Sequence, residues 1–304
     1  MKIISLQLEI FIIIIIGYIF ARKGIITKEV RKKLTDIVID LILPCAIIKS
    51  FMMKLTPEII RDTVVIFIVS FIIQLSYSIF NRLFYNHFDD SKAIILKYAT
   101  IVSNAGFMGL PIVESIYGQT GLLYASIALI PQRIFMWSAG LSLFTQTDSK
   151  SMIKKVALHP CIIAVYVGII FMIIESIGII LPTFMLNTIN AIGGCTTALS
   201  MLIIGAILND VKWSELVEKS SLYYSSIRLL IIPITIFICL SLCHMNSLVI
   251  GVSVLLAAMP AGSTAAMLAQ KYDQDVIYAS KIIVVSTMLS LITLPMISIL
   301  IKGG

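Results

Sequence analysis

Two short strings inside apolar segments carry the residue types that could bind a polar substrate. The first runs Ser103-Asn-Ala-Gly-Phe-Met-Gly-Leu-Pro111, and the second runs Met259-Pro-Ala-Gly-Ser-Thr-Ala-Ala266. Proline lacks the N–H that closes a helical hydrogen bond, and glycine lets the backbone leave helical geometry at little cost. Each string therefore predicts an interrupted helix. Unwound backbone at membrane depth persists only where it is buried in protein or lines a wet cavity, so we interpret the pair as a binding site. A kinked packing helix is the alternative for either string alone.

The polar groups of both strings are suited to an anionic substrate. The amide of Asn104 can donate to a carboxylate, or it can hold a carbonyl freed by the interruption; a helix-packing amide is the alternative. A helix that restarts after a break presents N–H groups and the positive end of its dipole, which favours a negative charge. The candidate substrate-binding residues of the strings are Asn104, Gly106, Gly109, Pro111, Pro260, Ser263 and Thr264.

Charged and amide side chains in neighbouring segments extend this candidate site. Arg133 lies well inside an apolar segment, where a charge costs about 2.5–3.5 kcal/mol and needs a partner. That partner is a substrate carboxylate, or else a fixed bridge to Glu114 or the interface reached by snorkelling. Gln132 is a neighbouring donor, and Glu114 is a candidate for proton coupling. Arg228 lies nearer the predicted cytoplasmic end of its helix, and we expect it to snorkel.

Composition places the chain in the membrane. Hydrophobic residues make up 59% and charged residues only 13% of the 304 residues, whereas a soluble domain carries about 25% charged residues. The five cysteines and three histidines have no metal-ligand spacing, so we expect no metal and no cofactor. A signal peptide is the alternative for residues 1–20, but a basic stretch follows them in place of a small-residue cleavage site.

Hydropathy predicts an all-α polytopic membrane protein with ten transmembrane helices. The expected spans are Leu6–Ala21, Leu34–Met52, Thr63–Asn81, Ala93–Tyr117, Gly121–Thr145, Val156–Ile177, Phe184–Leu208, Ser221–Cys243, Leu248–Gln270 and Val276–Ile301. Most lysine and arginine residues fall on one side if the N-terminus is outside. The positive-inside rule then predicts the cytoplasmic membrane with both termini outside, and it explains the net charge of +7 without nucleic acid.

Five spans precede Asp148 and five follow it. An odd number per half reverses the second copy, so we predict two inverted repeats, residues 1–148 and 149–304, within one membrane domain. The two strings fall in the fourth span of each half. This matching position favours a shared site over two unrelated kinks.

The chain resembles the auxin efflux carrier family, which includes bacterial malate and malonate permeases. The string from Asn104 to Pro111 is similar to the signature of the family's fourth helix. The segments Met259–Tyr272 and Ser290–Pro295 are similar to its last two helices. Weaker similarity occurs at Leu43-Pro44, Trp137–Gly140 and Leu202–Gly205.

This resemblance implies an architecture and a mode of assembly. It implies that broken helices 4 and 9 cross near the midplane, that helices 1, 2, 6 and 7 form a scaffold, and that helices 3–5 and 8–10 form a transport unit. It also implies a homodimer and a role for Asn104 in substrate recognition. Ala265 and Ala198 stand where many relatives have proline. The connection after Phe144 is short, as in the small prokaryotic permeases, so auxin is not the expected substrate.

The predicted function is secondary transport of a small organic anion, such as a carboxylate, by alternating access. The lipid bilayer and the substrate are the expected partners, with H⁺ or Na⁺ as possible coupling ions. A channel or a membrane sensor is the alternative. A membrane-embedded enzyme would need a nucleophile with a base or a metal cluster, and the sequence offers neither.

Overall fold

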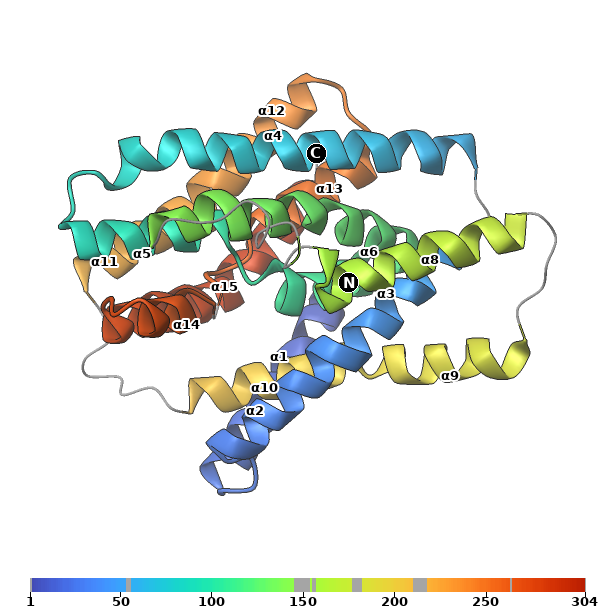
Figure 1. The fold of residues 1–304 in the computed structure, drawn as a ribbon, viewed down its shortest axis with the longest axis horizontal. Coiled ribbons are helices and arrows are strands. Elements are labelled where there is room, and N and C mark those ends of the chain that lie inside the picture. Colours follow the sequence, from blue (N-terminus) through green and yellow to red (C-terminus); the bar gives the residue numbers. More distant parts are fainter. Residues whose placement is uncertain are drawn as a thin grey trace. The chain divides into compact units, whose positions relative to one another are not determined.

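The computed structural model describes residues 2–52, 56–144, 154, 157–176, 182–209, 218–262 and 264–303. Its named elements in these ranges are all helical (Figure 1), which confirms the all-α prediction for this part of the chain. The chain divides into two compact units, each assembled from separate stretches of sequence. The prediction that a repeat boundary lies at Asp148 falls outside the described residues.

Unit 1 comprises Met1–Val64, Leu110–Ile127 and Ala157–Val211. Its first helices are α1 (Lys2–Arg22) and a continuous run made of α2 (Lys28–Ile37), the π-helix η1 (Val38–Ile42) and α3 (Leu43–Phe51). It also holds α8 (Pro160–Ser176), α9 (Thr183–Gly194), α10 (Thr196–Leu208) and the first part of α6 (Leu110–Phe135).

Unit 2 comprises Val65–Gly109, Ala128–Val156 and Lys212–Gly304. Its helices in the first half of the chain are most of α4 (Pro57–Tyr85), α5 (Asp90–Ile101), η2 (Ala105–Gly109), the end of α6, η3 (Met136–Gly140) and η4 (Leu141–Leu143). Those in the second half are α11 (Lys219–Ser226), η6 (Ile227–Ile231), α12 (Ile232–Leu242), α13 (Ser247–Ala257), α14 (Thr264–Lys271) and α15 (Val276–Gly303).

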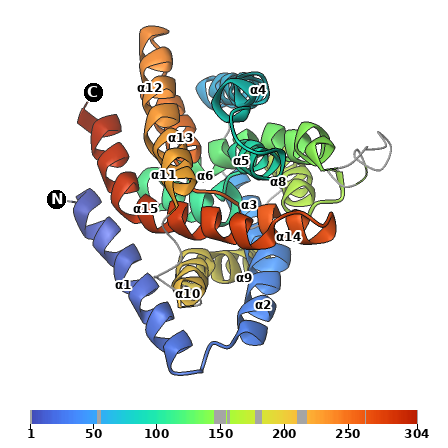
Figure 2. The ribbon, with the colours of Figure 1, turned by 90° about the vertical axis from the view of Figure 1, so that its left-hand side faces the viewer.

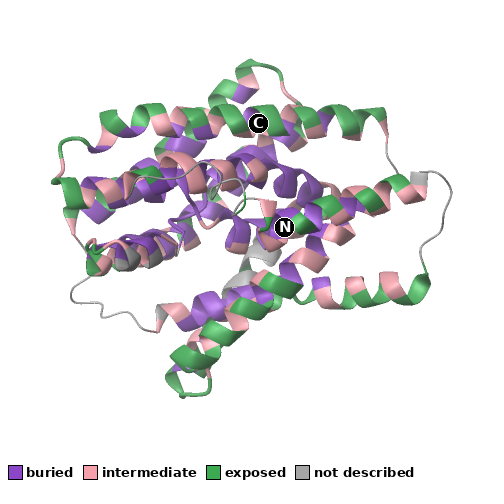
Figure 3. Ribbon diagram, viewed as in Figure 1, coloured by how far each residue is buried: buried purple, intermediate pink, exposed green. Residues whose placement is uncertain are grey.

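Five helices among the described residues are long and apolar enough to cross a membrane. They are Pro57–Tyr85, Ala105–Leu143, Thr183–Ile207, Lys219–Leu242 and Val276–Ile301. Ile68, Phe71 and Ile72 of α4 are exposed, as on a lipid-facing helix. Figure 3 shows exposed residues along much of this helix. In α6, Gly118 has φ 66° and ψ −155°, so the chain turns there between two helices, in the gap predicted between Tyr117 and Gly121.

Close helix contacts in unit 1 depend on glycine. α1 packs along α10 (Figure 2), and a Cβ added to Gly17 would overlap the carbonyl oxygen of Leu202. A Cβ added to Gly205 would overlap the carbonyl oxygen of Ile14. Small residues that let two backbones approach are typical of helix packing in membranes, where lipid competes with every apolar contact.

Three of the π-helical turns precede a proline. Each of these turns is followed directly by an α-helix that has proline at its second position. The prolines are Pro44 after η1, Pro111 after η2 and Pro233 after η6. A proline ring clashes with the carbonyl of the preceding turn, and the wider π turn makes room for that ring. These prolines therefore continue their helices in place of ending them.

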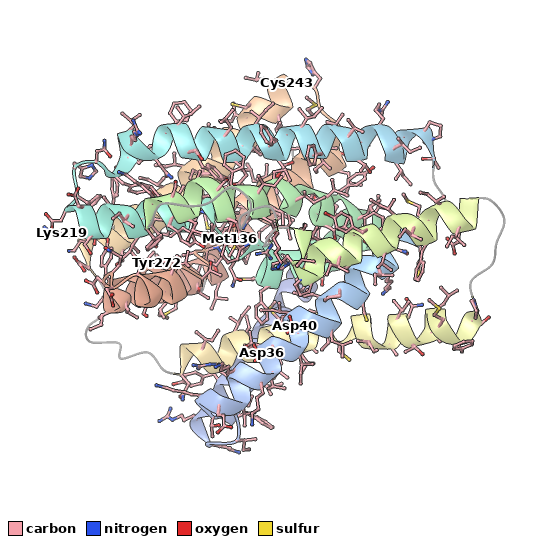
Figure 4. The ribbon with its side chains drawn as sticks, viewed as in Figure 1. Asp36, Asp40, Met136, Lys219, Cys243 and Tyr272 are labelled. Atoms are coloured by element: carbon pink, nitrogen blue, oxygen red, sulfur yellow. The ribbon has the colours of Figure 1, made fainter. Side chains whose placement is uncertain are left out.

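Charged side chains near the helix ends lie exposed or pair with each other. Asp36 and Asp40 lie exposed on the α2–η1 run (Figure 4), while the ion pair given for Lys33 is with Glu29 at 2.8 Å. In unit 2, Lys92 Nζ donates to Glu218 Oε1 at 2.6 Å. This hydrogen bond raises the pKa of Lys92 and lowers the pKa of Glu218, because it favours the charged form of each group.

Candidate functional site

Two interrupted helices meet in unit 2. α5 ends at Ile101 and the helix resumes at Ala105, while α13 ends at Ala257 and α14 begins at Thr264. Between these ends, Ser103 and Ala261 form an antiparallel bridge. The N–H of Asn104 donates to the carbonyl oxygen of Pro260 at 2.8 Å, and the N–H of Gly262 donates to that of Val102 at 3.1 Å. We call this pairing of residues 102–104 with 260–262 the crossing.

Side chains take up the other backbone groups freed at the crossing. Gln132 Nε2 donates to the carbonyl oxygen of Ser103 at 2.9 Å. Ser286 Oγ accepts from the N–H of Ala261 at 3.2 Å. Buried backbone groups need such partners, since an unpaired one costs about as much as a lost hydrogen bond. Gln132, which the sequence suggests as a substrate donor, therefore supports the backbone of the crossing.

Arg133 and Gly106 lie against each other. A Cβ added to Gly106 would stand 2.6 Å from Arg133 Nη2, so only glycine leaves room for the guanidinium there. Arg133 Nη1 contacts Met136 Sδ at 3.6 Å, and its buried Nε has no hydrogen-bond partner among the described residues. A partly buried cation with an unused donor thus lies beside the resumed helix after the first break.

The second string contributes a hydroxyl next to the same break. Tyr98 Oη donates to Thr264 Oγ1 at 3.3 Å, which joins α5 to the first residue of α14. Gly109 lies close to α13, since a Cβ there would be 3.0 Å from Leu256 Cδ2 and 3.2 Å from Met259 Cγ. The predicted residue Ser263 lies outside the described residues.

Two predicted site residues belong to the other unit. Pro111, which is buried, and Glu114 lie in the stretch Leu110–Ile127 of unit 1. The ion pair given for Glu114 is with Lys49 at 3.6 Å, within unit 1. Asn104, Gly106, Gly109, Gln132, Arg133, Pro260 and Thr264 all lie in unit 2.

The snorkelling expected for Arg228 is wrong. Its side chain is only 1% exposed, and its Nε donates to the carbonyl oxygen of Met259 at 3.1 Å, beside the crossing. The sequence contains one indication for this position, since an arginine directly before a long apolar run is rare in a membrane helix without an internal partner.

Long apolar helices together with two helices that break and pair inside one unit define a class, the multi-pass membrane transporters. Sequence comparison identifies the family. Residues 2–155 and 148–298 match the family described as Membrane transport protein. The chain belongs to this family, the auxin efflux carrier family, as the two strings suggested.

Relatives extend over nearly the whole chain. An uncharacterized transporter of Methanothermobacter thermautotrophicus is 28% identical over 299 residues, which are 97% of each protein. The uncharacterized transporter MJ1031 of Methanocaldococcus jannaschii is 24% identical over 94% of this chain and 95% of its own length. The uncharacterized transporter YfdV of Escherichia coli is 24% identical over 88% of this chain and 87% of its own.

Proposed function

We propose that the protein is a secondary transporter that moves a small organic anion across the cytoplasmic membrane, and that transport, not catalysis, is its activity. The crossing is the observation that carries this proposal. It gathers backbone polar groups, Asn104 and Arg133 inside a single unit of an otherwise apolar chain. Paired interruptions of this kind are where membrane carriers bind their substrates.

The charge at the site favours an anion. Arg133 has a buried donor without a partner among the described residues. Glu114, the acidic residue of α6 that follows the first break, is paired with Lys49. A carboxylate that accepts from a guanidinium gains a charge-assisted hydrogen bond, roughly twice as strong as a neutral one. The helix that resumes at Ala105 and α14, which begins at Thr264, also start next to the breaks and present the positive ends of their dipoles.

Alternating access is proposed from the division of the chain. Unit 1 holds α1 to α3 and α8 to α10, and unit 2 holds the crossing with α5 and α11 to α15. We assign unit 1 as the scaffold and unit 2 as the moving unit, in a homodimer with ten spans in two inverted repeats. Rigid-body motion of unit 2 would expose the crossing to each side in turn. Coupling to H⁺ through Glu114, or to Na⁺, belongs to the same proposal.

Asn104→Ala tests the site. The bond that joins Asn104 to Pro260 uses the backbone N–H, so alanine keeps the crossing and removes only the amide. A melting-temperature screen of purified protein against mono- and dicarboxylates first identifies a ligand, because ligands that bind the folded state raise its melting temperature. We expect Asn104→Ala to lower counterflow of that ligand in proteoliposomes at least tenfold with unchanged expression.

Asn86→Ala is the matched control, since Asn86 is exposed and follows α4 in the same unit. It should transport at the wild-type rate. Normal kinetics in Asn104→Ala would refute the assignment of this amide. Conductance that does not saturate with substrate would show that the protein is a channel and not a carrier.

A further inference from the structure

A small, partly open cavity lies in unit 2 beside the crossing. Its volume is about 20 Å³, and its walls come from α4, α6, η6 and α13, with Ser103 of the crossing at one side. About 10–15 Å³ of such space is enough to hold one water molecule. The cavity therefore has room for a single water-sized occupant.

Four polar groups in the cavity wall have no hydrogen-bond partner among the described residues. They are Arg228 Nη1, Tyr77 Oη, Ser253 Oγ and Gln74 Oε1. Their residues are at most 6% exposed. Buried polar atoms almost always have partners, so four unpartnered ones around one cavity indicate an occupant that hydrogen-bonds to them.

The charge balance of the cavity decides what this occupant is. Arg228 brings a positive charge into the wall, and among the residues that the structure places in the wall none carries a carboxylate. The carbonyl of Met259 and the ring of Tyr77, 5.1 Å from the guanidinium carbon, provide partial compensation. The C-terminal end of α13, just before Met259, supplies only about half a negative charge. Part of the positive charge of Arg228 therefore stays uncompensated at membrane depth.

We propose that this cavity binds one chloride-sized monovalent anion. Arg228 Nη1 and the hydroxyls of Tyr77 and Ser253 donate to it, and rotation of the Gln74 amide presents a fourth donor. A neutral water molecule would satisfy the same hydrogen bonds but would leave the charge of Arg228 uncompensated. The volume of about 20 Å³ favours a monatomic anion over sulfate or a carboxylate-bearing substrate.

The anion would also support the crossing. Arg228 holds the carbonyl of Met259, the residue before Pro260, and an anion on the far side of the guanidinium fixes its orientation. Binding to the folded state should therefore stabilise unit 2. This inference concerns an inorganic ion at a second position and does not depend on the identity of the transported substrate.

The test is thermal unfolding of the purified full chain while sodium chloride replaces sodium gluconate at constant ionic strength. We expect a saturable rise in melting temperature with chloride and with bromide, and none with sodium sulfate of equal ionic strength. Arg228→Gln should abolish the rise. Tyr77→Phe and Ser253→Ala each remove one hydroxyl donor and should weaken the apparent affinity for chloride roughly fivefold.

Ser290→Ala is the matched control. Ser290 is fully buried in unit 2 and bonds to the carbonyl of Thr287 in its own helix, away from the cavity. It should keep the wild-type affinity for chloride. No halide-dependent rise in the wild type would show water as the occupant and overturn the proposal. An equal rise in Arg228→Gln would overturn it too, and if that variant does not fold, unchanged affinity in both Tyr77→Phe and Ser253→Ala has the same meaning.

Discussion

The contact between Gly106 and Arg133 exists because one residue has no side chain. A Cβ at position 106 would stand 2.6 Å from Arg133 Nη2, too close for the guanidinium to keep its place. Glycine at position 106 therefore contributes more than a flexible backbone. It positions the cation that we propose to meet the carboxylate of the substrate.

Gly106→Ala should therefore act through Arg133. We expect it to weaken binding of the anionic ligand about tenfold or more, because alanine pushes the guanidinium from its position. Arg133→Gln should weaken binding to a similar degree. The double variant should lose little beyond either single variant, since residues that act as a unit are not additive. Ligand affinity from melting-temperature titrations measures all three.

Gly194→Ala is the control for this cycle, because nothing lies within 4 Å of a Cβ at that position. Its affinity should equal that of the wild type. Fully additive losses in the double variant would mean that Gly106 and Arg133 act separately.

Single residues also show where the sequence was insufficient. Arg228 and Arg133 have similar sequence contexts, since both are arginines within predicted membrane helices. The depth of Arg228 depends on Met259, thirty-one positions later, which becomes its neighbour only when α13 ends at the crossing. No local pattern contains that contact. The bond from Gln132 to the carbonyl of Ser103 likewise joins residues far apart in the sequence.

At the scale of elements, the sequence predicted more. Glycine and proline strings marked both interruptions because their cause is local chemistry. Apolar length predicted helices, and five helices among the described residues are long and apolar enough to cross a membrane. The π turns before Pro44, Pro111 and Pro233 were not foreseen, since a proline equally predicts a kink or a helix end.

The α1–α10 contact makes a prediction about stability. Gly205→Ala places a methyl group against the backbone of Ile14, which cannot rotate away as a side chain can. We expect a loss of roughly 1–3 kcal/mol, the usual cost of overpacking, seen as a lower melting temperature in detergent. Gly17→Ala should behave alike, and Gly194→Ala should be neutral or slightly stabilising, since alanine favours a helix. Equal melting temperatures for all three variants would contradict the contact.

At the scale of the whole molecule, the chain passes repeatedly between two units. The unit that holds the crossing is built from both halves of the sequence, and so is the other. The anion that we propose to bind at the crossing would be held by groups of unit 2 and would move with that unit. Motion of one unit against the other is what the proposed alternating access involves.

The orientation in the membrane can be tested with one residue at each end of a single helical run. The run from Lys28 to Phe51 has consecutive segments of 10, 5 and 9 residues, which give about 36 Å of helix at 1.5 Å per residue. This exceeds the roughly 30 Å of a bilayer core. Lys28 begins this run and Glu58 follows it in the first turn of α4, and both are exposed. The positive-inside rule predicts that Lys28, which has basic residues around it, lies in the cytoplasm.

Lys28→Cys and Glu58→Cys, each in a variant without the five native cysteines, should therefore differ in labelling. In intact cells we expect a membrane-impermeant maleimide to label Glu58→Cys, and to label Lys28→Cys only after the cells are permeabilised. The reverse pattern would place the N-terminus inside. Equal labelling of both cysteines in intact cells would mean that the run from Lys28 to Phe51 does not cross the membrane, which would remove the basis for opposite access to the two sides.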